Sequence, residues 1–246
     1  MKYYDRVRNN VYSQNGEDGI LTVLTHELGI EPSTLWCVDV GAFDGIAYSN
    51  VRQFIDKGAN AVMIEPSMVG SGLGEPKFEN LVDLPNQFPN VTVFNYAVIP
   101  LSYTNEEKEL TLRQIEKGDA NWGKHREEKL EGMDLDTILS KTKIPEDYDI
   151  LNIDTDKCDH PIWEGHTKYK PKIVIIEIES SIPPNSTKEV GGMFSFSQSL
   201  ALAKEKEYSL VCHTGNMIYV RNDLVERLSI PHELINSVGL FNRSWL

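Results

Sequence analysis

The stretch from Lys172 to Ile178, KIVIIEI, constrains the fold more than any other part of the chain. Its four consecutive Ile and Val residues favour a β-strand, and a strand without polar alternation has both faces covered. Strands that are covered on both faces belong to parallel sheets with helices on either side. The chain is therefore expected to fold as an α/β domain.

Periodicity and turn residues predict that such strands alternate with helices. The predicted strands cover residues 36–40, 61–64, 91–98, 150–153, 172–178, 208–213 and 217–220, and the predicted helices cover 18–28, 49–57, 78–88, 135–140 and 195–206. Thr214-Gly215-Asn216 between the last two strands is typical of a hairpin. The pattern predicts a Rossmann-like, doubly wound and mostly parallel sheet of seven strands with a C-terminal antiparallel hairpin.

No linker or repeat interrupts the 246 residues, so we expect a single domain over residues 1–246. The glycine-rich residues 70–76 are expected to form a loop. Residues 102–132 are charged and weakly periodic. We expect them to form an inserted excursion or lid, with a hairpin around residues 109–115, a loop after it, and Trp122 and His125 as acceptor contacts.

Charge and composition exclude several classes of partner. The net charge of -13 disfavours nucleic acid, which is bound through clustered Lys and Arg. No apolar run is long enough to span a bilayer. An export signal is not expected, and three scattered cysteines indicate a reducing, cytoplasmic location. The acidity is explained either by solubility or by a site for a cation, and nothing predicts an oligomeric state.

The segment from Val38 to Asn50, VDVGAFDGIAYSN, is the strongest candidate for a ligand loop. Gly41 and Gly45 open a tight turn after a buried strand, where a ligand can approach the backbone. Asp44 occupies the place where a dinucleotide site keeps a glycine, so the loop suits a sulfonium and an ammonium group better than a pyrophosphate. Glu65 ends the next strand and is placed to accept both hydroxyls of a ribose. The alternatives are a turn without a ligand for the loop and a solvent-exposed glutamate without a role for Glu65.

A second group of carboxylates follows the fourth and fifth strands. Asp154, Asp156 and Glu177 would be hard oxygen ligands for Mg²⁺ or Mn²⁺, or caps of the next helix. His160 and His166 lie near this edge, and either is a candidate general base. A surface histidine without a role is the alternative.

In this order, the motifs resemble those of the FkbM family of methyltransferases, in the branch with an SQxGED signature. The matching segments are SQNGED at 13–18, VDVGAFDG–SN at 38–50, IEP at 64–66, IDTDKCD at 153–159 and VIIE at 174–177. The resemblance implies a class I methyltransferase fold and S-adenosylmethionine as cofactor. It implies cofactor contacts from Gln14, Glu17, Asp39, Gly41, Ala42, Asp44, Gly45, Ser49, Asn50, Glu65 and Pro66, with residues 1–30 closing over the cofactor. It also implies O-methylation of sugars in polysaccharides, glycolipids or natural products.

The expected reaction is an in-line transfer of a methyl group to a hydroxyl of a small, sugar-type acceptor, which is free, nucleotide-linked or part of a glycan. A divalent ion on Asp154, Asp156 and Glu177 would lower the pKa of that hydroxyl, and His160 or Asp154 would take its proton. One alternative is a metal-dependent glycosyltransferase, because Asp154-Thr155-Asp156 is a DxD motif. Another is a non-catalytic module that keeps only the cofactor site.

Overall fold

The computed structural model describes residues 3–66, 78–117, 130–155, 157–187 and 193–241. The strands are β1 (Trp36–Val40), β2 (Asn60–Ile64), β3 (Val91–Phe94), β4 (Ala97–Val98), β5 (Gly132–Met133), β6 (Ile150–Ile153), β7 (Ile173–Glu177), β8 (Tyr208–His213) and β9 (Asn216–Arg221). The α-helices are α1 (Glu17–Glu27), α2 (Arg52–Ile55), α3 (Phe78–Gln87), α4 (Asn105–Lys117), α5 (Leu135–Leu139), α6 (Asp159–Gly165) and α7 (Phe196–Glu205). Short 3-10 helices are η1 (Tyr3–Val7), η2 (Asn222–Arg227), η3 (His232–Leu234) and η4 (Val238–Leu240).

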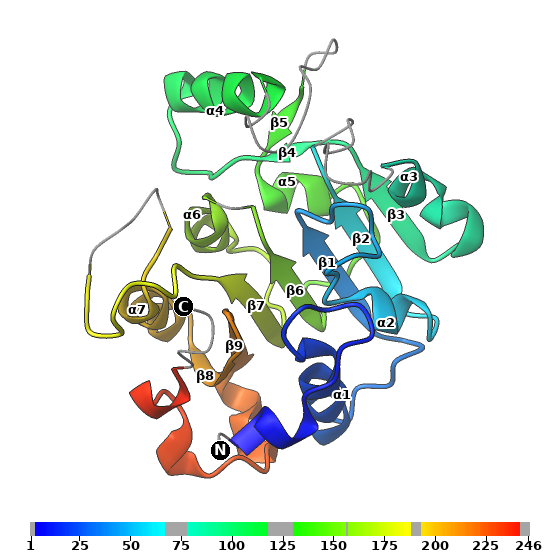
Figure 1. Ribbon diagram of the computed structural model, residues 1–246. Coiled ribbons are helices and arrows are strands. Elements are labelled where there is room, and N and C mark those ends of the chain that lie inside the picture. Colours follow the sequence, from blue (N-terminus) through cyan, green and yellow to red (C-terminus); the bar gives the residue numbers. More distant parts are fainter. Residues whose placement is uncertain (1–2, 67–77, 118–129, 156, 188–192, 242–246) are drawn as a thin grey trace.

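Seven of the strands form one central sheet in the order β3-β2-β1-β6-β7-β9-β8 (Figure 1). Every neighbouring pair is parallel except β7–β9 and β8–β9. The single antiparallel strand is β9, which enters through the hairpin after β8. This topology confirms the predicted fold class.

Alternate residues of the central strands feed two separate cores, because successive side chains point to opposite faces. Cys37 and Ile150 pack in one cluster with residues of α1, α2 and α3. Val38 and Leu151 pack in the other with residues of α5, α6 and α7. Helices therefore cover both faces of the sheet, as the apolar strand β7 requires.

Two predictions about the middle of the chain were wrong. The strand expected over residues 91–98 is two strands, and β4 leaves the main sheet to pair with β5. The expected hairpin around residues 109–115 is the helix α4. Its start is a capping box, in which Glu107 accepts from the N–H of Thr104 at 2.7 Å and Thr104 Oγ1 accepts from the N–H of Glu107 at 3.3 Å. In Figure 1, α4, β4 and β5 stand beside the central sheet.

This small unit rests on both ends of α6. Tyr103 lies 3.6 Å from the sulfur of Cys158, just before α6. A Cβ on Gly165, at the end of α6, would lie 2.9 Å from Cβ of Leu101. The excursion is therefore packed against the helix that follows β6. Trp122 and His125, proposed as acceptor contacts, lie outside the described residues, as do residues 70–76.

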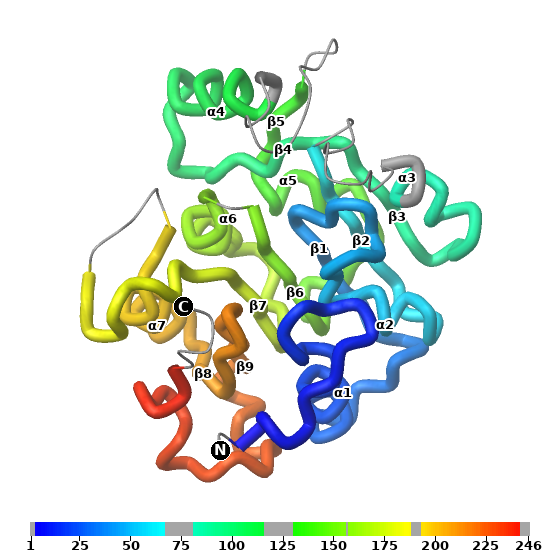
Figure 2. Tube along the Cα trace, in the orientation of Figure 1, coloured from blue at the N-terminus to red at the C-terminus, as the bar shows by residue number. Residues whose placement is uncertain are grey.

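The N-terminal segment crosses the sheet face beside α2 (Figure 2). Oδ2 of Asp18 accepts hydrogen bonds from the backbone N–H groups of Val11, Tyr12 and Ser13 at 2.7–2.9 Å. Gln53 of α2 donates to the backbone oxygen of Asp18 at 2.8 Å. The segment is thus fixed to α2.

None of the helices in the described ranges has the length and apolar character that a bilayer span needs.

Candidate active site

The sheet changes winding direction between β1 and β6. From β1 the chain moves outward to β2 and β3, and it returns on the other side of β1 as β6. In open α/β sheets, ligands bind at the carboxyl ends of the strands that flank such a switch point. The candidate site is therefore the edge where Gly41 follows β1 and Asp154 follows β6.

The loop after β1 has a backbone that side chains rarely allow. Gly41 and Gly45 have φ of 82° and 72°, and Phe43 and Tyr48 have positive φ as well. A Cβ on Gly41 would lie 1.8 Å from the backbone oxygen of Asp154. Glycine is therefore required at position 41, because the loop touches the end of β6 there. Any residue with a Cβ would push the two strands apart.

Most N–H groups of this loop already have acceptors within the protein. Those of Gly41 and Ala42 donate to Ile64, and that of Gly45 donates to Ala42. The Phe43 N–H donates to Glu65 Oε2 at 2.9 Å. The N–H groups of Ile46 and Ala47 donate to Oδ1 of Asp44 at 2.9 and 2.7 Å. A loop that binds phosphate keeps such groups for the ligand, so this one is poorly suited to a pyrophosphate.

Asp39 lies behind the loop at the centre of a buried polar network. Its carboxylate accepts from Nδ2 of Asn152 at 2.7 Å and from Ser49 Oγ at 3.1 Å. Nδ2 of Asn50 in turn donates to Oδ1 of Asn152 at 2.9 Å. Burial raises the pKa of Asp39 to about 6, although the bonds from Asn152 and Ser49 oppose this shift. Asp39 therefore positions the loop from behind.

Ser49 also holds the turn before α2, since its Oγ accepts from the N–H groups of Val51 and Arg52 at 3.4 and 3.2 Å. The helix predicted over residues 49–57 is shorter in the structure, from Arg52 to Ile55. Ala42 and Asp44 are buried in the loop, and Pro66 follows Glu65 half-buried. The expected cofactor residues from Asp39 to Pro66 thus gather around the ends of β1 and β2.

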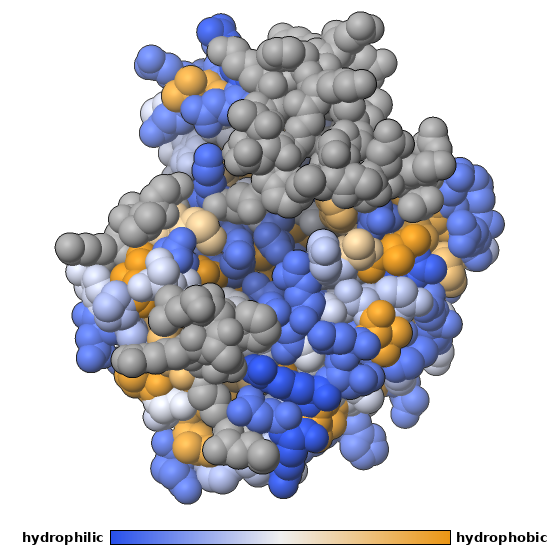
Figure 3. Space-filling model, viewed as in Figure 1, coloured by the Kyte–Doolittle hydropathy of each residue, from blue (hydrophilic) through white to orange (hydrophobic). Residues whose placement is uncertain are grey.

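Acidic residues follow three strands of this edge. Ile64, Val40, Ile153 and Ile176 form one row of register partners across the sheet. The next residues are Glu65, Gly41, Asp154 and Glu177, so three carboxylates lie at the carboxyl edge. Hydrophilic side chains gather in the middle of the face drawn in Figure 3.

The predicted metal centre does not form among the described residues. Within those ranges, no three His, Cys, Asp or Glu side chains come together as a metal site. Asp154 is exposed at the end of β6, Glu177 is half-buried, and Asp156 lies outside the described residues. Asp159 instead accepts from the N–H of Thr155 at 2.6 Å and holds the turn before α6. The described side chains at this edge therefore do not provide a set of ligands for a divalent ion.

His160, the second residue of α6, is buried and stacks on Phe194 with ring centroids 4.3 Å apart. Burial lowers its pKa to about 3. The imidazole is therefore neutral at physiological pH and a poor proton acceptor. This argues against the expected role of His160 as general base.

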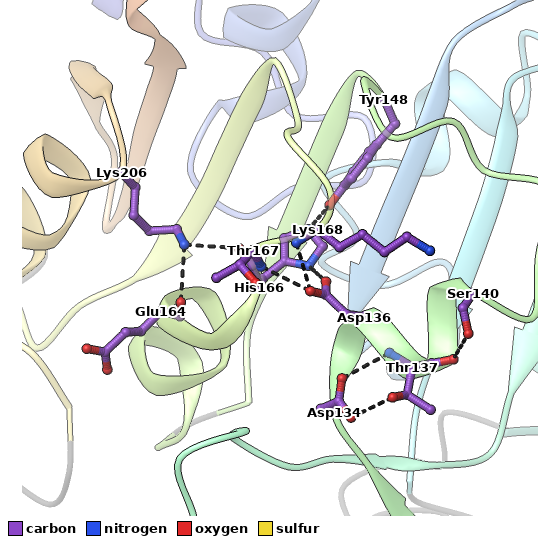
Figure 4. A network of polar contacts seen from close by, with 10 residues as sticks. All are labelled: Asp134, Asp136, Thr137, Ser140, Tyr148, Glu164, His166, Thr167, Lys168 and Lys206. Atoms are coloured by element: carbon purple, nitrogen blue, oxygen red, sulfur yellow. Dashed lines mark hydrogen bonds and ion pairs between the residues drawn. The ribbon is translucent and has the colours of Figure 1, made fainter.

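His166 has a structural environment that excludes it as the alternative base (Figure 4). Its Nε2 lies 3.0 Å from the hydroxyl of Tyr148, and its Nδ1 lies 2.5 Å from Oδ1 of Asp136. Lys206 donates to the backbone oxygen of His166 at 3.0 Å. Both ring nitrogens have partners and the side chain is fully buried, so His166 is not available to an acceptor. Its contacts instead join α5 to the ends of α6 and α7.

Gln14 and Glu17, expected to close over the cofactor, occupy different environments. Gln14 is exposed. Glu17 is buried, and its carboxylate accepts from Thr214 Oγ1 at 2.6 Å and from the N–H of Asn15 at 2.8 Å. Because both carboxylate oxygens are engaged, we assign Glu17 as an anchor that ties the N-terminal segment to the β8–β9 turn.

A hollow of about 430 Å³ lies at the opposite, amino edge of the sheet, lined by Trp36, Asp149 and Lys172 among others. Its charged groups are paired with each other, since Lys172 Nζ lies 2.6 Å from Asp149 Oδ1. Asp149 also accepts from the N–H of Trp36 at 2.8 Å. The hollow and the candidate residues therefore lie at opposite edges of the sheet. We place the site at the switch point, because the loop with positive φ angles and the carboxylates of Glu65, Asp154 and Glu177 are there.

Sequence reasoning missed Asn152. The signal was an amide inside an otherwise apolar strand, ILNI, because a buried polar side chain needs partners. Its partner could not be identified without the register that places it beside Asp39.

No protein-family model matches the chain, and no curated protein matches it. The resemblance to FkbM methyltransferases is therefore unsupported by these comparisons. Solved structures are similar in fold at low identity. One is a SAM-dependent methyltransferase from Aquifex aeolicus, with 10% identity and a TM-score of 0.39 over 83% of this chain and 87% of that one.

A protein from Klebsiella pneumoniae, described as a presumed O-methyltransferase, has 11% identity and a TM-score of 0.46 over 87% of this chain and 84% of that one. A protein from Lactococcus lactis, described as a presumed hemolysin, has 11% identity and a TM-score of 0.43 over 87% and 90%. Likeness at this level carries no information about activity.

Proposed function

We propose that this chain binds S-adenosylmethionine at the switch point and transfers its methyl group to a hydroxyl of a sugar-type acceptor. The observation that carries the proposal is the loop after β1. It has the glycines of a ligand loop, but its N–H groups from Gly41 to Ala47 are largely bonded to protein acceptors. A phosphate ligand would find few free N–H donors in this loop, whereas a cationic ligand would lie near acidic side chains.

The residues of the site fit this cofactor. Asn50 is buried, and its Oδ1 has no hydrogen-bond partner among the described residues. Such an acceptor requires a donor, and the cofactor has both an ammonium group and hydroxyls. Glu65, held by the Phe43 N–H, would accept the ribose hydroxyls at the end of β2. Gly41 and Gly45 would let the ligand approach the loop, and Gln14 would contact it from the N-terminal segment.

The cofactor supplies an activated methyl group, so the protein mainly has to position the acceptor and receive a proton. Asp154 lies exposed beside Gly41 at the end of β6. We assign its carboxylate to bind the acceptor hydroxyl and take its proton. The neutral His160 does not take part as a base. The sugar class of the acceptor is the expectation from the FkbM resemblance, and no metal is included, because the described residues do not fit one.

Calorimetric titration separates the proposal from its main alternative. S-adenosylhomocysteine should bind, and a nucleotide sugar with Mn²⁺ should not. Glu65→Gln should weaken the binding of S-adenosylhomocysteine about tenfold, the effect of one strong hydrogen bond. Binding of the nucleotide sugar alone would favour a glycosyltransferase with a DxD motif.

Activity is measured as transfer of radiolabelled methyl from S-adenosylmethionine to a panel of free and methyl-glycosidic monosaccharides. Asp154→Asn should abolish transfer and leave cofactor affinity unchanged. If cofactor binds but no acceptor in a wide panel of sugars and glycans is labelled, the chain is a binding module.

A further inference from the structure

The buried side chains of Asp39, Asn152 and Asn50 form a chain of hydrogen bonds across the switch point. Asp39 and Asn152 are register partners on β1 and β6, so their side chains lie on the same face of the sheet. Asn152 Nδ2 donates to Asp39 at 2.7 Å, and Asn50 Nδ2 donates to Asn152 Oδ1 at 2.9 Å. The three residues are only 1%, 4% and 4% exposed.

The carboxylate at one end determines the orientation of both amides. An ionised carboxylate only accepts hydrogen bonds, so Asn152 has to turn its NH₂ group toward Asp39. The oxygen of Asn152 then faces Asn50, which must present its own NH₂ group. The oxygen of Asn50 is left over. Flipping Asn50 would bring two acceptors together, so the unpaired acceptor is enforced by the network.

The result is a buried carbonyl oxygen without a donor, which is costly unless a ligand supplies one. Among the described residues, Asn50 Oδ1 has no hydrogen-bond partner. It belongs to the β6 side of the loop, through Asn152, whereas Glu65 ends β2 on the other side of β1. A ligand whose ribose reaches Glu65 and extends across Gly41 would bring its amino-acid end toward Asn50.

We propose that Asp39 and Asn152 are positioning residues that hold Asn50 Oδ1 as the acceptor for the α-ammonium group of the methyl donor. This inference rests on the proposed function. An ammonium group fits better than the carboxylate of the same ligand, because an amide oxygen cannot donate. The nearby Asp39 also favours a cation over a neutral donor.

Two ligands that differ at the amino-acid end test the assignment by calorimetric titration. S-adenosylhomocysteine carries the ammonium group, and methylthioadenosine has the same nucleoside and thioether without it. Asn50→Ala should weaken S-adenosylhomocysteine about 10–100-fold, as expected for a hydrogen bond to a charged group. It should change methylthioadenosine by less than about threefold.

Further variants separate positioning from general damage. Asn152→Leu removes the group that fixes the amide of Asn50, and it should also weaken S-adenosylhomocysteine selectively. Urea unfolding of each variant checks that it folds, and Asn50→Ala alone carries the test in the case in which Asn152→Leu does not fold. Ser199→Ala is the matched control, because it removes a buried hydroxyl bonded to Tyr219 away from the switch point, and it should leave both affinities unchanged.

The outcomes are distinguishable. Equal losses for both ligands, or none for either, would overturn the role of Asn50 while leaving the proposed function intact. If neither ligand binds the wild-type protein, the proposed function itself fails.

Discussion

The carboxylate of Asp39 accepts a 2.7 Å hydrogen bond from Nδ2 of Asn152, its register partner on the neighbouring strand. This bond joins the two strands between which the sheet reverses its winding, and it connects through Asn50 to the loop after β1. A buried carboxylate in this position makes the candidate site sensitive to pH. The site also depends on the close approach of Gly41 to the backbone oxygen of Asp154.

The pH dependence of stability should report the ionisation of Asp39. Burial raises its pKa from 3.8 to about 6, so the folded protein binds this proton more tightly than the unfolded chain does, although the carboxylate is mainly ionised at pH 7. The stabilising contribution is therefore complete below about pH 4 and is lost as the pH rises through 6. Relative to Asp39→Asn, which cannot ionise, the wild-type protein should lose about 2 kcal/mol of unfolding free energy between pH 4 and 7.

Urea unfolding of both proteins at several pH values measures this difference. Parallel stability curves for the two proteins would contradict the raised pKa of Asp39.

His160 should show the opposite dependence. Its pKa falls from 6.5 to about 3 through burial, so the folded state favours the neutral ring. Its contribution is present above pH 6.5 and is lost as the pH falls toward 3. NMR signals of His160 should stay those of a neutral imidazole at pH 5. A midpoint for His160 near 6.5 would restore it as a candidate base.

Gly41→Ala should destabilise the protein by about 3 kcal/mol or more, because a positive φ and a backbone clash add together. The added Cβ would lie 1.8 Å from the oxygen of Asp154. Gly29→Ala is the control, since Gly29 has φ of 71° but no atom within 4 Å of an added Cβ, and it should cost about 1–2 kcal/mol. Chemical denaturation compares the two variants, and equal losses would show that the contact with β6 is unimportant.

Cofactor binding should not depend on a divalent ion. The described residues bring no three metal-ligating side chains together. The affinity for S-adenosylhomocysteine should therefore agree within about twofold in EDTA and in Mg²⁺, a difference below about 0.5 kcal/mol. A tenfold loss in EDTA that Mg²⁺ restores would return a metal to the site.

The local sequence was sufficient to predict the helices and strands that have a regular hydrophobic period. The apolar run of β7 and the alternation of strands and helices predicted the layers, because periodicity alone decides which faces are buried. The same reasoning failed at residues 109–115, where the charged surface of α4 obscured its periodicity. The capping box at Thr104 and Glu107 was the available signal there.

The order of the chain also predicted that Glu65 and Asp154 end strands and that Gly41 directly follows one, and parallel strands bring such ends to one edge. Only the tertiary structure decided how these groups are used. It buried His160 and Glu17, paired Asp39 with Asn152 across 113 residues, and left the oxygen of Asn50 unpaired. The physical reason is that strand endings follow from local patterns, whereas the desolvation and hydrogen-bond partners of a side chain depend on register and packing between distant segments.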